Sequence, residues 1–146
     1  MDIRLMTPTD YDGVWELWSG TPGVGLREMD DSRNGILRFL RRNPDTNFVA
    51  TEASLIVGTI LCGYDGRRGY IYHVTVHSDH RGCGIGRALV ERVMASLERE
   101  GVFKASLVVF SDNEGGNEFW ERVGFKKRDD LYYRDSLVFT LYPSGL

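Results

Sequence analysis

The 146-residue sequence predicts a single α/β domain that spans residues 1–146. Strand and helix patterns alternate along the chain, and no repeat, low-complexity tract or linker separates them. A content of 42% hydrophobic and 27% charged residues fits one globular domain with a sizeable core. The strongest β pattern, at residues 70–77, leads directly into a glycine-rich turn and a helix.

The first part of the chain predicts one strand and two helices. Residues 2–6 form the strand, and Pro8 opens a helix with one apolar side, formed by Val14, Trp15, Leu17 and Trp18. Asp31 or Ser32 can cap a second helix that runs to about Arg42, where an Asn-Pro-Asp stretch stops it.

Three β-rich runs follow. Residues 47–52 and 55–64 are separated by two residues only, which predicts an antiparallel hairpin. In the third run, at residues 70–77, strict alternation places Tyr70, Tyr72, Val74 and Val76 on one face. A bulge near Tyr72 and His73 would instead direct Ile71, Val74 and Val76 to the core. The sequence leaves both registers open.

The stretch SDHRGCGIGRALVERVM, residues 78–94, places three glycines at every second position and then becomes helical up to about residue 100. A strand, a glycine turn and a helix N-terminus together offer converging backbone N–H groups and a positive helix dipole, which suit a phosphate or diphosphate. Arg81 and Arg87 add positive charge. A tight turn with solvated arginines is the simpler alternative.

Two other phosphate-binding motifs do not match this loop. A P-loop requires Gly-Lys followed by Ser or Thr, whereas Gly86 is followed by Arg87 and Ala88. A dinucleotide fingerprint would require its third glycine at position 87, and it would follow the first strand of the fold. These mismatches argue against a nucleoside triphosphatase and make a Rossmann domain a minor alternative.

The last part of the chain predicts two strands around a short helix. Residues 104–110 and 131–141 are rich in β-branched and aromatic residues. Residues 111–125 between them predict a capped helix that ends at Gly124.

Charge and cysteine content exclude several classes of function. A formal charge of -3 and a pI near 5.6 argue against a nucleic-acid partner. The first residues lack the pattern of a secretory signal, and no run approaches the roughly 20 apolar residues of a membrane span. We therefore expect a cytoplasmic protein without a membrane partner. Cys62 and Cys83 have no partners at metal-ligand spacing, so we expect neither a disulfide framework nor a metal site.

Two motifs resemble the GNAT superfamily of acetyl-CoA-dependent N-acetyltransferases. RGCGIG at residues 81–86 matches the family's RxxGxG loop, and NEGGNEFWERVGF at residues 113–125 resembles its asparagine, aromatic and Gly-Phe block. The stretch IVGTILCGYDGRRG, residues 56–69, is similar to the bacterial YpeA-like branch. The resemblance implies a mixed, strongly twisted sheet with helices on both faces and a cleft between two central parallel strands, at residues 70–77 and 104–110.

The resemblance also implies where acetyl-CoA, the expected co-substrate, would bind. Its diphosphate would contact Arg81 and the backbone of Gly82, Cys83, Gly84, Ile85, Gly86 and Arg87. Its pantetheine arm would pair with Val74, Thr75 and Val76. Asn113 would contact this arm or help to close the cleft, with a helix N-cap as the alternative role, and Phe119 and Trp120 would lie along the thioester end.

Direct attack of an amine on the acetyl group requires a base, an oxyanion donor and an acid. His73 is the candidate base, acting through water, and the backbone N–H of Val74, freed by a bulge, is the candidate oxyanion donor. In the family, the position of Trp120 is usually a tyrosine that is taken as the general acid. An indole is not a proton source at neutral pH. Either solvent protonates the sulfur or another side chain does, and Tyr72, Tyr132 and Tyr133 are the candidate acids. Tyr70 and Tyr72 are poorer alternatives to His73 as the base.

The expected substrate is a primary amine of an unidentified small molecule or peptide, bound near loops 20–31 and 63–69. Glu28, Asp30 and Asp31 would attract a cationic amine, or else form a solvated, helix-capping loop. The alternative function is an acetyl-CoA sensor with little or no turnover, since the usual acid is replaced. The sequence leaves a homodimer open.

Overall fold

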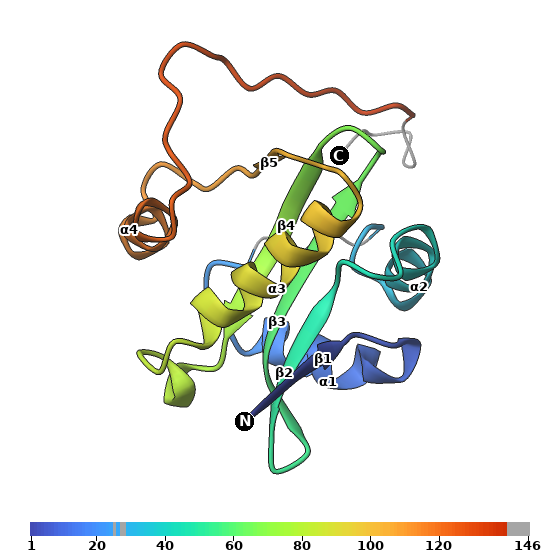
Figure 1. The fold of residues 1–146 in the computed structure, drawn as a ribbon. Helices are drawn as coiled ribbons and strands as arrows, with labels where there is room; N and C mark the ends of the chain where they lie inside the picture. Colours follow the sequence, from blue (N-terminus) through green and yellow to red (C-terminus); the bar gives the residue numbers. More distant parts are fainter. Residues whose placement is uncertain (25, 27–28, 140–146) are drawn as a thin grey trace.

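The computed structural model describes residues 1–24, 26 and 29–139, and it places five strands in one sheet (Figure 1). The strands lie in chain order and are β1 (Asp2–Leu5), β2 (Phe48–Glu52), β3 (Leu55–Tyr64), β4 (Gly69–Val76) and β5 (Ala105–Ser106). The first three pairings are antiparallel, and β4 and β5 are parallel. The predicted mixed sheet is confirmed.

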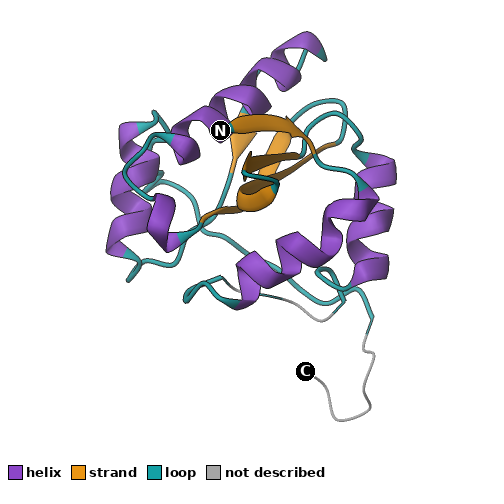
Figure 2. Cartoon of the chain, turned by 90° about the horizontal axis from the view of Figure 1, so that it is seen from below, coloured by secondary structure: helices purple, strands orange, loops and turns teal. Residues whose placement is uncertain are grey.

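Helices cover both faces of this sheet, as Figure 2 shows. The α-helices are α1 (Tyr11–Ser19), α2 (Arg33–Arg42), α3 (Ile85–Arg99) and α4 (Glu114–Arg122), and two short 3-10 helices are η1 (Pro8–Asp10) and η2 (Ser78–His80). The predicted fold class is therefore confirmed. No helix in the described ranges is both long and apolar enough to cross a membrane.

Two apolar clusters hold the helices on the sheet. On one face, Ile85, Leu89, Val93 and Leu97 of α3 pack on Phe48, Ile60 and Ile71. On the other, Val14 and Trp18 of α1 and Ile36 and Leu40 of α2 pack on Val49 and Leu61. The period of the apolar positions in each helix thus matches the face that it buries. Trp15, which was expected on the apolar side of α1, is exposed.

The β2–β3 hairpin forms through the predicted two-residue turn. Ala53 and Ser54 have φ angles of 49° and 68°, the left-handed values that a tight hairpin turn of this twist requires. In the next turn, the Asp65 carboxylate accepts hydrogen bonds from the backbone of Arg67 and Arg68 at 2.8 and 2.9 Å.

A β-bulge in β4 decides between the two registers that the sequence left open. Leu61 pairs with His73 and Cys62 pairs with Ile71, so Tyr72 is the extra residue. Ile71, Val74 and Val76 consequently pack in the cluster beneath α3. The rings of Tyr72 and His73 lie on the opposite face, against Phe39 and Trp18.

The C-terminal strands differ from the prediction. Of residues 104–110, only Ala105 and Ser106 form a strand, paired with Gly69 and Tyr70. The predicted closing strand is wrong for residues 131–139, which form an exposed, extended loop, and residues 140–141 lie outside the described part (Figure 1). β-branched and aromatic residues favour a strand only where a neighbouring strand and a core face receive them, and this segment has neither.

Candidate functional site

The glycine loop leaves open space above its backbone. Gly82 and Gly84 have φ angles of 78° and 82°, and a Cβ atom added at either residue would meet no atom within 4 Å. Gly84 is the N-cap of α3 and has no side chain to satisfy the first turn of that helix. The positive φ angles explain why glycine occupies both positions.

Six consecutive backbone N–H groups in this loop, at residues 82–87, have no hydrogen-bond acceptor among the described residues. The first helical bond of α3 joins the Ala88 N–H to the Gly84 carbonyl at 3.0 Å. Unpaired N–H groups at the positive end of a helix dipole form an anion-binding site. The loop therefore offers groups that suit a diphosphate, and its binding there stays a prediction.

Two arginines flank these N–H groups and are themselves anchored. The Arg81 Nε–H donates to the Val76 carbonyl at 3.1 Å, and an Arg87 guanidinium N–H donates to the Arg122 carbonyl at 3.4 Å. Both side chains are exposed and keep further N–H groups for an anion. These contacts also link the start of α3 to the end of β4 and to α4.

Gly86 has a different role from the other two glycines. A Cβ atom at this position would lie 3.0 Å from the Phe119 ring of α4, so the glycine permits close packing of α4 against α3. Phe119 and Trp120 stack edge to face at 5.0 Å, and Trp120 and Phe125 do so at 5.1 Å. Trp120 is thus a packing residue of this aromatic cluster.

Asn113 is the N-cap of α4. Its Oδ1 atom accepts a hydrogen bond from the Gly116 N–H at 2.9 Å, which is the capping role that the sequence left as an alternative. Contact between Asn113 and a bound cofactor stays a prediction.

Most of one edge of β4 is unpaired. β5 pairs with Gly69 and Tyr70 only, and no described strand pairs with residues 71–76 on that side. The predicted parting of the two parallel strands therefore begins after Tyr70. Val74, Thr75 and Val76 lie on this edge, which ends at the glycine loop and can pair with an extended ligand.

His73 is held by a carboxylate that the sequence assigned elsewhere. Its Nε2 atom lies 3.1 Å from Asp31 Oδ1, and the two side chains are 17% and 4% exposed. Ser32, rather than Asp31, caps α2, because its Oγ atom accepts the Gly35 N–H at 3.1 Å. Asp30 is exposed, and Glu28 lies outside the described residues. No local pattern marks a pair that is 42 residues apart.

Three tyrosines lie close together on the same face of the sheet. The Tyr70 and Tyr72 rings are 4.8 Å apart, and burial raises the pKa of both phenols. Tyr133, itself exposed, is near enough to raise both pKa values further. Tyr70 and Tyr72 therefore keep their protons at neutral pH and can act as hydrogen-bond donors. Tyr132 is almost fully exposed and does not share in these interactions.

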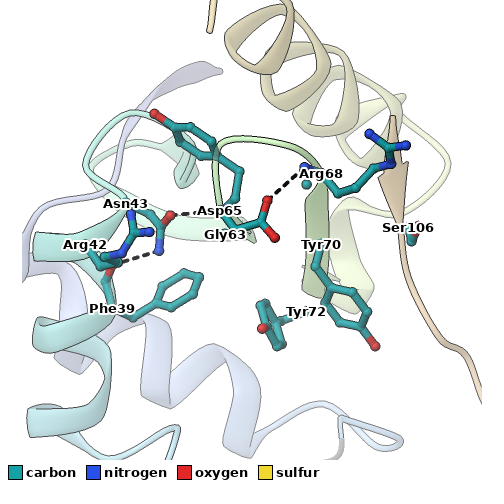
Figure 3. A pocket seen from close by; sticks show the side chains of 11 residues that line it. Phe39, Arg42, Asn43, Gly63, Asp65, Arg68, Tyr70, Tyr72 and Ser106 are labelled. Carbon is teal, nitrogen blue, oxygen red and sulfur yellow. Dashed lines mark hydrogen bonds between the residues drawn. The ribbon is translucent and has the colours of Figure 1, made fainter. Parts of the chain in front are cut away.

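A hollow of about 380 Å³ opens beside these tyrosines (Figure 3). Phe39 and Arg42 of α2 form one wall, and Tyr70 and Tyr72 of β4 form the other. Asp65, Arg68 and Ser106 are among the other residues that line it. The predicted substrate loop at residues 63–69 thus contributes to this hollow. Tyr72, which also lines it, directly precedes His73 in the sequence.

Cysteine and metal chemistry receive no support from the geometry. Burial raises the pKa of the Cys62 thiol to about 12, which makes it a packing group, and Cys83 lies exposed in the glycine loop. Within the described ranges, no cluster of three or more histidine, cysteine, aspartate and glutamate side chains could hold a metal ion.

Comparison with known proteins identifies the family. The model of the acetyltransferase (GNAT) family matches residues 11–125. An acetyltransferase from Sodalis glossinidius is 36% identical over 131 residues, which cover 90% of this chain and 91% of that protein. An acetyltransferase from Yersinia enterocolitica is 32% identical and covers 94% of this chain and 96% of its own.

Solved structures share the fold. The PaiA N-acetyltransferase from Thermoplasma acidophilum, solved with coenzyme A, has a TM-score of 0.77 at 19% identity, and covers 88% of this chain and 91% of its own. Ard1 from Thermoplasma volcanium has a TM-score of 0.75 at 23% identity, over 84% of this chain and 80% of its own.

The chain belongs to the acetyltransferase (GNAT) family and is an acetyl-CoA-dependent acyltransferase. The resemblance seen in residues 81–86 and 113–125 is thereby confirmed. The narrower bacterial branch stays a prediction.

Proposed function

We propose that this enzyme transfers the acetyl group of acetyl-CoA directly to a primary amine of a small molecule or peptide, within a ternary complex. The observation that supports this most is the row of unpartnered N–H groups at residues 82–87, which leads into the unpaired edge of β4. Together they offer a diphosphate site and a strand edge for an extended arm.

Different residues of the chain would bind different parts of acetyl-CoA. The backbone of residues 82–87, with Arg81 and Arg87, would hold the diphosphate, and residues 74–76 would pair with the pantetheine arm. Asn113, Phe119 and Trp120 would flank this arm from α4. When bound, acetyl-CoA supplies an acetyl thioester that an amine can attack.

Groups around the bulge of β4 would carry out the proton transfers. His73 would take the proton that the substrate ammonium must lose before its nitrogen can attack. The Val74 N–H would donate to the acyl oxygen as negative charge develops there. The phenols of Tyr133 and Tyr72 would donate to the departing sulfur, and burial raises the pKa of Tyr72, which keeps its phenol protonated.

The amine would approach from the face that carries the hollow of Figure 3. Tyr72 lines this hollow and precedes His73 in β4, so a substrate seated there would reach the proposed base. We expect Tyr72→Ala to raise the KM for the amine more than the KM for acetyl-CoA. An equal rise in the two KM values would show that the hollow does not bind the amine.

The decisive experiment measures thiol release from acetyl-CoA with spermidine, glucosamine, tyramine and an alanine-initiated peptide as separate acceptors. Coenzyme A binding is measured in parallel by calorimetry. We expect thiol release and an acetylated amine with at least one acceptor class. Tight coenzyme A binding without release for any amine would contradict amine acetylation by this chain.

Three further expectations from the sequence stay predictions: a cytoplasmic location, the lack of a nucleic-acid partner and a homodimer. That residues 1–146 form a single domain also stays a prediction.

A further inference from the structure

The face of β4 opposite α3 carries a buried side-chain pair. We propose that Asp31 is a positioning residue that fixes the proton of His73 on Nε2 and leaves Nδ1 as the atom that accepts the substrate's proton. This inference rests on the proposed amine acetylation and adds a second residue to its base. The 3.1 Å contact between Asp31 Oδ1 and His73 Nε2 carries the argument.

Several elements hold the two partners in place. The Tyr11 hydroxyl of α1 donates to the Asp31 backbone carbonyl at 2.8 Å, and Ser32 caps α2 at the next position. The Trp18 ring of α1 contacts the His73 imidazole at a centroid distance of 5.2 Å. The bulge at Tyr72 sets which face of β4 the imidazole occupies. The carboxylate and the ring are therefore preorganised by the folded core.

The chemistry of a carboxylate sets the tautomer. An ionised carboxylate only accepts hydrogen bonds, so the imidazole nitrogen that faces it must carry a proton. His73 Nδ1 has no hydrogen-bond partner among the described residues, and its lone pair is free to act as a base. A buried carboxylate also stabilises the imidazolium that forms when Nδ1 takes a proton.

The proton balance of the step is simple. The substrate ammonium transfers one proton to Nδ1, and its freed lone pair forms the new C–N bond as the C–S bond breaks. The sulfur keeps the bonding electrons and is protonated. The nitrogen loses a second proton after it attacks. Of this proton and the one on Nδ1, one ends on the sulfur and the other is released to solvent. The products are one acetylated amine, one thiol and one proton.

Two buried polar atoms without a hydrogen-bond partner lie in the same region as this pair. Trp18 Nε1 and Thr75 Oγ1 are on side chains that are only 1% and 4% exposed, and neither has a hydrogen-bond partner among the described residues. Trp18 touches the His73 ring, and Thr75 follows His73 by two positions along the strand. A buried polar group without a partner costs free energy, so its place beside the proposed base calls for an explanation.

The first test reads the tautomer in the wild-type protein without any ligand. Long-range ¹H–¹⁵N spectra of the imidazoles are recorded at a pH where His73 is neutral. We expect a single tautomer, protonated at Nε2 and slow to exchange that proton with water. A proton on Nδ1 would overturn the proposal, because that nitrogen could not then act as the base.

The second test is a double-mutant cycle on acetyl transfer to the most active amine of the panel above. We expect Asp31→Asn to lower kcat roughly 10- to 100-fold, with little change in the KM for acetyl-CoA. In the His73→Gln background, the same substitution should change kcat less than about twofold, since its effect passes through the imidazole. A full further loss in that background would show a structural role instead.

The chain offers a matched control for this cycle. Asp79 lies 3.9 Å from His77 in an exposed histidine–aspartate contact, and Asp79→Asn removes the same charge there. We expect it to leave kcat unchanged. If no amine of the panel is acetylated, the proposed function fails, but the imidazole spectra still decide the tautomer.

Discussion

The two faces of β4 differ in what they bury. Toward α3, Ile71, Val74 and Val76 join an apolar cluster with no unsatisfied polar group. Toward α1 and α2, His73 and Thr75 lie beside the second apolar cluster, and this face also buries the Asp31 carboxylate and two polar atoms, Trp18 Nε1 and Thr75 Oγ1, that have no partner in the described residues. We call it the polar face of β4. One extra residue at the bulge separates these two environments within a single strand.

This difference teaches where stability and chemistry reside. The apolar face fixes α3 on the sheet, and so places the start of that helix beside the end of β4, where we propose the anion site. The polar face keeps titratable groups partly dehydrated, which suits proton transfer. Four experiments test this division, and they are ordered by the size of the expected effect.

The largest effect is expected from His73→Gln on the polar face. Loss of a general base lowers rates roughly 100- to 10,000-fold, and we expect this fall in kcat with an unchanged KM for acetyl-CoA. Steady-state thiol release measures both constants. His77→Gln, in the exposed turn after β4, is the matched control, and an equal loss there would break the assignment of His73.

Gly84→Glu tests the anion site next to the apolar face. A carboxylate above the unpaired N–H groups repels a diphosphate, and the positive φ angle disfavours any side chain. We expect the affinity for coenzyme A to fall about 100-fold, as measured by calorimetry. Gly101→Glu is the matched control. Gly101 has a similar φ angle of 76° and lies beyond the other end of α3, so this substitution should leave the affinity for coenzyme A unchanged.

Trp120→Tyr asks whether the missing tyrosine limits turnover. Because Trp120 stacks between Phe119 and Phe125, we expect a change in kcat of less than about threefold and a loss of about 1 kcal/mol in unfolding free energy. Denaturant titration and steady-state kinetics measure the two effects. A large gain in kcat would instead show that an acid is missing at this position.

The smallest effect compares two buried threonines that face each other across β3 and β4. Thr59 donates its hydroxyl to the Phe48 carbonyl at 3.1 Å, whereas the Thr75 hydroxyl has no partner in the described part of the chain. Thr59→Val should lower the unfolding free energy by about 1 kcal/mol, and Thr75→Val should leave it equal or raise it. Equal losses in chemical denaturation would contradict the orphan status of Thr75.

Sequence patterns predicted the elements that depend on local residues. The β-rich run at residues 55–64, the two-residue turn before it and the glycine turn at residues 82–86 are local signals, and the structure contains each of these elements. The bulge at Tyr72 was one of two open registers. Its choice depends on which face meets α3, and that is a tertiary contact.

The features that sequence reasoning missed depend on distant partners. Asp31 was assigned to a solvated or capping loop, but the burial of its side chain against His73 follows from how α1 and α2 cover the sheet. Residues 131–139 have strand-forming side chains and still form no strand, because no neighbouring edge receives them.

The central claim is that residues 82–87 bind the diphosphate of coenzyme A while β4 receives its arm. Backbone ¹H–¹⁵N spectra of the labelled protein, titrated with coenzyme A, test it most directly. We expect the largest shifts at the amides of residues 82–87, followed by those of residues 74–76. Shifts confined to the hollow beside Phe39 and Tyr72, with the loop amides unchanged at saturation, would contradict it.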